Sequence, residues 1–130
     1  MFKVEVDKPA NLLAISYIGS IGPKEILLCE EQAKSLVRDL APGFRLLTDL
    51  TELELMDLDC LPSIKRMMDF SNNNGVDMVV RVIPDPKKDI GLNILSLFHY
   101  KKRVRIVTCK TLREAREVLG QGSVVATRLS

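Results

Sequence analysis

The sequence has little of what most active sites and membrane anchors require. Its one histidine, His99, has no acid or cysteine beside it, so it supports neither a catalytic triad nor a histidine-based metal site, and we expect a structural role for it. No Gly-x-Gly-x-x-Gly or phosphate-loop lysine motif occurs. No apolar run approaches the about 18 residues of a membrane span, and charges alternate with apolar residues at positions 2–7, where a signal peptide needs an apolar run. We therefore expect neither export nor stable membrane insertion.

Cysteines and net charge exclude further classes of protein. The three cysteines, Cys29, Cys60 and Cys109, are odd in number and far apart, and none forms the Cys-x-x-Cys pair used for zinc binding or thiol exchange. This pattern is typical of a reduced, cytoplasmic chain without a cofactor. Nineteen basic and seventeen acidic residues give a net charge of +2, too little for the positive field of a dedicated nucleic-acid-binding protein. We expect no nucleic acid as a partner.

What the sequence does contain is a core. Hydrophobic residues make up 46% of the 130 residues and charged residues 28%, which is the balance of a globular chain. A chain of this length buries about two-thirds of the surface that its unfolded form exposes. We assign residues 1–120 to a single domain and residues 121–130 to a C-terminal tail, in which a β-prone run at 124–127 is either an edge strand or disordered.

The first third of the chain predicts two strands and a helix. Apolar and polar residues alternate over 2–7, and a second apolar strand over 12–18 follows so closely that the two must pair antiparallel. Pro23 suits the first turn of a long helix. Leu27 and Leu28 fall off the apolar stripe of this helix and are candidates for an exposed patch that forms a homodimer, whereas Glu30 is expected on the solvent side. The predicted stripe consists of Ile26, Cys29, Ala33, Leu36, Val37 and Leu40.

The remainder alternates strands with helices. Strands are predicted over 44–50, 76–83 and 104–108, and helices over 61–70, 90–100 and 111–120. Thr111 and Glu114 have the spacing of a capping box, and Gly120 is placed as the terminator of the last helix. The order β-β-α-β-α-β-α-β-α predicts a single-domain α/β fold with a mixed, mostly parallel sheet of about five strands and about four helices.

The segment over 48–62 is the candidate site. An apolar strand runs into five carboxylates and then into a helix start, and ligands of open α/β sheets bind outside the carboxyl ends of the strands. Strand alternation should turn Glu52 and Glu54 to solvent, away from Leu53 and Leu55, which disfavours a shared cation. The five acids are Asp49, Glu52, Glu54, Asp57 and Asp59. Asp57 and Asp59 should also keep the Cys60 thiol protonated and silent, against the opposite effect of a helix N-terminus.

Two short runs in this segment resemble the STAS domain, the fold of bacterial anti-sigma factor antagonists and of the cytoplasmic tails of sulfate transporters. Asp49-Leu50-Thr51 stands where that family has Asp-Leu-Ser. Eight residues after Asp49 begins Asp57-Leu58-Asp59-Cys60, where the family has Asp-Ser-Ser-Gly or Asp-Thr-Ser-Gly. Only Asp57 is kept. Leu58 replaces the first hydroxyl residue, Asp59 stands at the position of the phosphorylated serine, and Cys60 replaces the glycine.

The resemblance implies a non-enzymatic regulatory module that docks on a protein of the anti-sigma or switch-kinase type. The implied partner-binding residues are Asp49, Asp57, Leu58, Asp59, Cys60 and Ser63. Asp59 either mimics a phosphoserine with a fixed negative charge or caps the following helix. Thr51 and Ser63 are further candidate phosphorylation sites. The alternative function is a small-molecule or lipid carrier, because lipid-transfer domains have a similar arrangement of sheet and helices.

Overall fold

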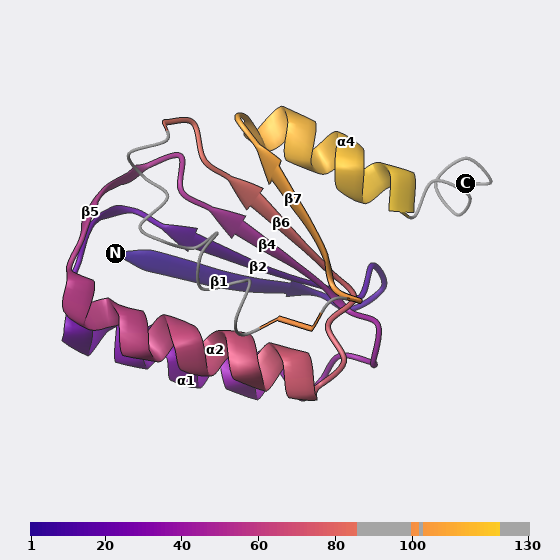
Figure 1. The fold of residues 1–130 in the computed structure, drawn as a ribbon, viewed down its shortest axis with the longest axis horizontal. Helices are drawn as coiled ribbons and strands as arrows, with labels where there is room; N and C mark the ends of the chain where they lie inside the picture. Colours follow the sequence, from indigo (N-terminus) through magenta and orange to yellow (C-terminus); the bar gives the residue numbers. More distant parts are fainter. Residues whose placement is uncertain (86–99, 102, 123–130) are drawn as a thin grey trace.

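The sheet is mixed, as the sequence predicts (Figure 1). The computed structural model describes residues 1–85, 100, 101 and 103–122. The first two strands pair antiparallel, with Phe2 opposite Tyr17, and the other three run parallel to the second. The spatial order is β1-β2-β4-β6-β7. The strands are β1 (Phe2–Asp7), β2 (Leu12–Tyr17), β4 (Arg45–Asp49), β6 (Met78–Val82) and β7 (Arg105–Cys109).

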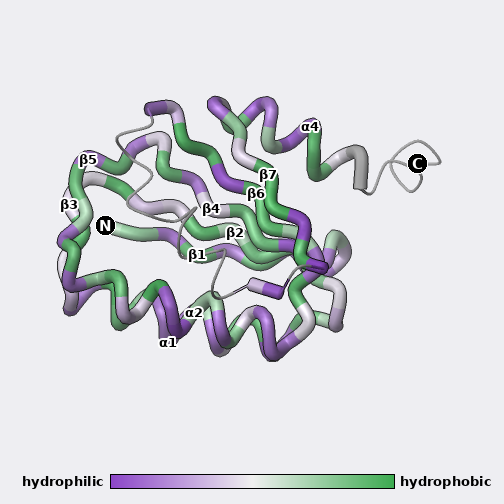
Figure 2. Tube along the Cα trace, viewed as in Figure 1, coloured by the Kyte–Doolittle hydropathy of each residue, from purple (hydrophilic) through white to green (hydrophobic). Residues whose placement is uncertain are grey.

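Helices cover both faces of the sheet, and the sheet separates the core into two apolar clusters (Figure 1). On one face, α1 (Pro23–Val37) and α2 (Leu61–Asn73) lie side by side over a large apolar cluster. On the other face, α4 (Leu112–Gly122) covers a smaller cluster made mainly by β6 and β7. Figure 2 shows hydrophobic residues following the central strands, whereas α1 and α2 alternate between hydrophobic and hydrophilic positions. This is the pattern expected when a helix buries one side only.

α1 follows its predicted stripe, with one exception. Pro23 occupies the first helical position, and Ile26, Cys29, Ala33 and Val37 are buried. Leu27 and Leu28 are exposed, as predicted. The prediction for Glu30 is wrong, because this side chain is only 5% exposed. α2 packs beside α1 and supplies a cation to it, so the side of α1 that a single-helix pattern assigns to solvent is covered by a neighbour.

Two short strands were not predicted. β3 (Gly19–Ile21) pairs parallel with β5 (Leu53–Met56) in a separate two-stranded sheet. The register shifts between Gly19 and Ser20, so Gly19 opposes Leu53 and Ser20 opposes Leu55. Such a bulge breaks strict alternation. Leu53 and Met56 are consequently both buried while Leu55 is 66% exposed, which corrects the expectation that Leu55 shares a face with Leu53.

The C-terminal helix differs from its prediction at its end. One of the two hydrogen bonds of the predicted capping box forms, because the Glu114 N–H donates to Thr111 Oγ1 at 3.1 Å. The prediction that Gly120 terminates α4 is wrong, because the helix continues to Gly122. The predicted helix over 90–100, His99 and the tail run over 124–127 lie outside the described residues. Of the helices that the structure describes, none combines the length and apolarity that a membrane crossing requires.

Candidate functional site

The junction between β4 and α2 is anchored along its whole length. Its apolar residues Leu50, Leu53, Met56 and Cys60 are all buried. Its backbone is tied to neighbouring strands, because the Leu50 N–H donates to Val82 O at 3.0 Å and the Asp57 N–H donates to Ile21 O at 3.1 Å. A loop held at such short intervals has few alternative conformations. The side chains between the anchors are therefore presented to solvent from a defined backbone.

Those outward side chains have a distinctive chemistry. Leu58 is 72% exposed and Leu55 66% exposed. Around them the chain carries four exposed acids, and no Lys, Arg or His occurs over 46–64. We call this set the acidic–leucine surface, and it consists of Glu52, Glu54, Leu55, Asp57, Leu58 and Asp59. The sequence pattern located the acids, but the burial assigned to Leu55 from alternation was wrong.

Asp57, and not Asp59, caps the start of the helical segment. A 3₁₀ turn over Leu58–Cys60 precedes α2, and Asp57 Oδ1 accepts a hydrogen bond from the Asp59 N–H at 2.8 Å. The N-cap position of α2 is Cys60, and no side chain caps it. The capping role predicted for Asp59 is therefore corrected, because the extra turn moves the cap two residues upstream. The Asp59 carboxylate is exposed near a helix N-terminus, where a negative charge is favourable.

Two of the predicted partner-binding residues lie beneath the surface. Cys60 is fully buried, and its thiol contacts Ile21 O at 3.6 Å. Burial, and then the charges of Asp57 and Asp59, raises the pKa of this thiol. Ser63 is also buried, and its Oγ accepts a hydrogen bond from Arg66 Nη2 at 2.9 Å. Direct contact of Cys60 or Ser63 with a partner is thus contradicted by their burial, and both instead support the surface from below.

An ion pair behind Ser63 holds the two helices together. Arg66 of α2 donates from Nη2 to Glu30 Oε1 at 2.8 Å and from Nε to Glu30 Oε2 at 2.9 Å, and Lys34 Nζ donates to Glu30 Oε2 at 2.6 Å. Burial raises the pKa of Glu30, but the bonds from Arg66 and Lys34 outweigh it and lower the pKa to about 2. No local pattern predicts this pair, because its two residues lie 36 positions apart in the chain. It fixes α2, and with it the 3₁₀ turn, against α1.

Asp49 lies apart from the acidic–leucine surface. Along β4, Asp49 shares a face with Leu47, which packs in the cluster beneath α4. Cys60 and α2 belong to the opposite face of the sheet. Asp49 Oδ1 accepts bonds from the N–H and the hydroxyl of Thr51 and so shapes the first turn after the strand. The structure therefore brings together Asp57, Leu58 and Asp59 but does not bring Asp49 to them.

The space beneath α2 bears on the carrier alternative. A cavity of about 40 Å³ lies between α2 and the sheet, with Met67 and Met68 on the helix side and Tyr17, Arg81 and Tyr100 among its other lining residues. A water molecule needs roughly 10–15 Å³ of such volume, so this cavity has room for a few waters and not for an acyl chain. Among the residues that the structure describes, no group of three or more His, Cys, Asp or Glu could hold a metal ion.

Comparison with known proteins identifies the architecture. No family model matches the sequence, and neither does any curated protein. Solved structures do match: an uncharacterised protein of the DUF3478 family with a SpoIIAA-like fold from Shewanella loihica has a TM-score of 0.69 at 13% identity, covering 91% of this chain and 93% of that one. The anti-sigma factor antagonist SpoIIAA in its unphosphorylated form has a TM-score of 0.63 at 12% identity, covering 94% of this chain and 99% of that one. An anti-sigma factor antagonist from Mycobacterium paratuberculosis has a TM-score of 0.59 at 19% identity, covering 92% of this chain and 94% of that one.

Proposed function

Because the chain has the SpoIIAA-like, STAS-like fold that anti-sigma factor antagonists share, we propose that it is a non-enzymatic, cytoplasmic regulatory module that binds a protein through the acidic–leucine surface. Two of the proteins with this fold are anti-sigma factor antagonists, which supports a partner of the anti-sigma or switch-kinase type. The three buried free thiols support a reducing compartment.

The observation that carries this proposal is the exposure of Leu58. A leucine that is 72% exposed on a fixed turn, three residues from a second exposed leucine and flanked along the chain by exposed carboxylates, has no role in the described core. Exposed apolar side chains rimmed by charge are typical of protein interaction sites. Covering such a leucine contributes about 1.5–3 kcal/mol. The partner should therefore offer an apolar pocket with a positively charged rim.

The chemistry of the site supports binding over catalysis. Its thiol is buried with a raised pKa, so Cys60 is a poor nucleophile. The hydroxyl of Ser63 is buried and engaged by Arg66, which makes it a poor phosphorylation site. Asp59, at the position of the family's phosphoserine, has an exposed carboxylate, and this favours a fixed negative charge at the docking surface over a phosphorylation switch.

The proposal is tested by affinity capture from extracts of the source organism with quantitative mass spectrometry. Leu58→Asp and Asp59→Lys should each lose the partner that the wild type retains, because one removes the apolar contact and the other reverses a charge. Asp39→Lys and Leu28→Asp are matched controls, since Leu28 on α1 and Asp39 in the turn after α1 are both exposed and lie outside the acidic–leucine surface. All four substitutions are at exposed positions, so thermal unfolding should stay close to that of the wild type.

Two outcomes would contradict the proposal. Capture that survives both Leu58→Asp and Asp59→Lys would exclude the acidic–leucine surface as the docking site. Loss with Leu28→Asp and not with Leu58→Asp would move the interface to α1. A captured partner should then be purified and titrated against the wild type, and its affinity should fall as salt rises, because the expected contact is partly electrostatic.

A further inference from the structure

The face of the sheet under α4 is only partly covered. α4 packs on β6 and β7, at one end of the strand order. The strands at the other end, β1 and β2, are not covered by α4 (Figure 1). Arg45 holds α4 in this position, because its guanidinium donates to Leu119 O at 2.6 Å and to Ala10 O at 2.9 Å. Between α4 and β1 the structure has a hollow of about 210 Å³. No sequence pattern pointed to it.

The strand register explains why a hollow forms there. Two neighbouring rows cross the sheet on this face, one from Lys3 through Ser16 to Asp49 and the next from Glu5 through Ala14 to Leu47. The middle residue of each row, on β2, is small, while the residues on β1 and β4 are long or charged. The floor is therefore low at the centre and high at both sides. Leu112 and Arg116 of α4 form the remaining wall.

Among the described residues, not every charge that lines the hollow has a partner. Lys3 Nζ and Glu5 Oε1, both on β1, form an ion pair at 2.7 Å. No described residue forms a hydrogen bond or ion pair with the Arg116 guanidinium, although Asp49 and Glu5 line the same space. Asp49 uses Oδ1 for Thr51, and within the described part of the chain Oδ2 accepts no hydrogen bond. An unpaired cation and a carboxylate oxygen thus face one space from two elements.

We propose that this hollow binds a small zwitterion, an α-amino acid or a dipeptide with free ends. Its carboxylate would pair with Arg116, whose planar guanidinium suits bidentate contact with a carboxylate. Its ammonium group would pair with Asp49 Oδ2. Ser16 also lines the hollow, on its β2 floor, and its hydroxyl supplies a further polar contact. The site is on the opposite face of the sheet from α2 and is independent of the acidic–leucine surface.

Size and charge together select this class of ligand. The lining residues carry two cations, Lys3 and Arg116, and two anions, Glu5 and Asp49, so a ligand with no net charge is favoured over a simple anion. The volume is smaller than the roughly 300–1,000 Å³ of drug-sized ligand pockets. A nucleotide or a lipid would exceed it.

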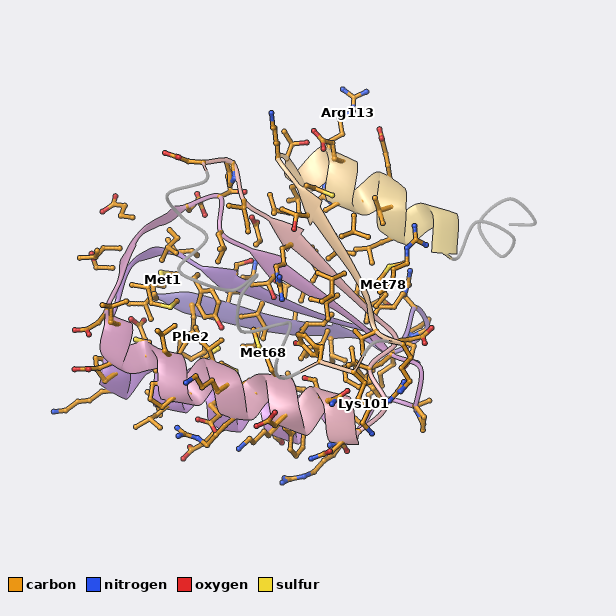
Figure 3. The ribbon with its side chains drawn as sticks, in the orientation of Figure 1. Met1, Phe2, Met68, Met78, Lys101 and Arg113 are labelled. Carbon is orange, nitrogen blue, oxygen red and sulfur yellow. The ribbon has the colours of Figure 1, made fainter. Side chains whose placement is uncertain are left out.

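The test is a calorimetric or NMR titration of the full chain with the common α-amino acids and with dipeptides. Arg116→Gln should weaken binding about tenfold or more, the loss expected for a charge-assisted carboxylate contact. Arg113→Gln is the matched control, because Arg113 lies on the same helix, is 90% exposed and projects away from the sheet (Figure 3). N-acetylated and C-amidated forms of the best ligand should each bind more weakly than the free form.

Further variants separate the site from the fold. Ser16→Leu should fill the floor and abolish binding, and amide spectra of β2 and β4 should show that the sheet is kept. The proposal is overturned if no amino acid or dipeptide binds at millimolar concentration, if Arg116→Gln and Arg113→Gln behave alike, or if the acetylated and amidated forms bind as well as the free zwitterion. Tighter binding of inorganic phosphate than of any zwitterion would likewise reject it.

Discussion

Glu30 is a buried carboxylate that joins α1 to α2. Its carboxylate lies almost out of contact with water, yet it accepts three bonds from Arg66 and one from Lys34. A buried charge is tolerated when it is paired and its oxygens are hydrogen-bonded. Arg66 is about half exposed, so it gives up little hydration to make this pair. The contact ties α1 to α2 beside the candidate docking surface.

Replacing this carboxylate should therefore destabilise the fold. We expect Glu30→Gln to lower the free energy of unfolding by about 1–3 kcal/mol, because the amide accepts fewer and weaker bonds from the two cations. Urea denaturation followed by circular dichroism measures the change. Glu31→Gln is the matched control at an exposed position of the same helix and should change stability by less than about 0.5 kcal/mol. Equal effects would show that Glu30 makes no net contribution.

The same residue predicts a pH dependence. Folding lowers the pKa of Glu30 from an ordinary 4.5 to about 2. A carboxyl whose pKa is depressed by folding contributes stability that is fully present above its unfolded pKa and is lost as the pH falls through the folded pKa. The stability difference between wild type and Glu30→Gln should thus be constant above about pH 5 and shrink as the pH falls toward 2. Unfolding measured across that range checks it, and a pH-independent difference would contradict it.

Single residues also show where sequence reasoning ends. The exposure of Leu27 and Leu28 followed from their place off the stripe of α1, and the structure confirms it. The burial of Glu30 could not be predicted, because it depends on Arg66, 36 residues away. The cap at Asp57 depends on a 3₁₀ turn that is too short to leave a pattern.

At the scale of elements, the turns decide how strands and helices join. Gly75 follows α2 with a φ of +86°, and its carbonyl accepts a hydrogen bond from the Gly43 N–H at 2.7 Å. Gly19 begins β3 with a φ of +70°. Both glycines have backbone angles that other residues adopt only at a cost. They differ in surroundings, because a Cβ on Gly75 would lie 3.2 Å from Pro42 Cβ, whereas a Cβ on Gly19 would meet nothing within 4 Å.

The two glycines form a matched pair for substitution by alanine. Gly19→Ala should cost only the backbone strain, about 1 kcal/mol. Gly75→Ala should cost more, by about 1 kcal/mol or above, because the new methyl group also crowds the Cα of Pro42 at 3.3 Å. Denaturation midpoints of the two variants measure the difference. Equal losses would show that the turn after α2 moves aside at little cost.

Most elements were predictable from the sequence, and the exceptions share a cause. The β1–β2 pair, α1, β4, α2, β6 and β7 all follow from periodicity and turn residues, because each is long enough to repeat its pattern. β3 and β5 have three and four residues and are held by pairing with each other, which no local pattern reports. The extension of α4 past Gly120 shows that one glycine does not end a helix whose neighbouring residues continue it.

At the scale of the whole molecule, the two apolar clusters on the faces of the sheet, together with the packed helices, keep all three cysteine thiols away from solvent. Cys29, Cys60 and Cys109 are all free and buried. Burial is the main cause that raises their pKa values, that of Cys29 to about 12. A protonated, inaccessible thiol does not attack a disulfide reagent.

We therefore expect none of the three thiols to react promptly with an aromatic disulfide at neutral pH in the native protein. All three should react in denaturant, and the native rate should follow the rate of opening. Absorbance of the released thiolate measures both. Prompt reaction of one thiol in the native state would place it at the surface and would reopen Cys60 as a contact residue.

The sequence by itself determined the order of the five strands of the main sheet and of α1, α2 and α4, the mixed sheet and the position of the acidic junction, because local periodicity reports which side of an element is apolar. Tertiary structure alone decided that Asp49 lies on the α4 face, that Cys60 and Ser63 lie beneath the surface, and that β2 forms the floor of a charged hollow. Each of these depends on which distant segments become neighbours. Such pairings are fixed by the packing of the whole chain, and no single segment carries them.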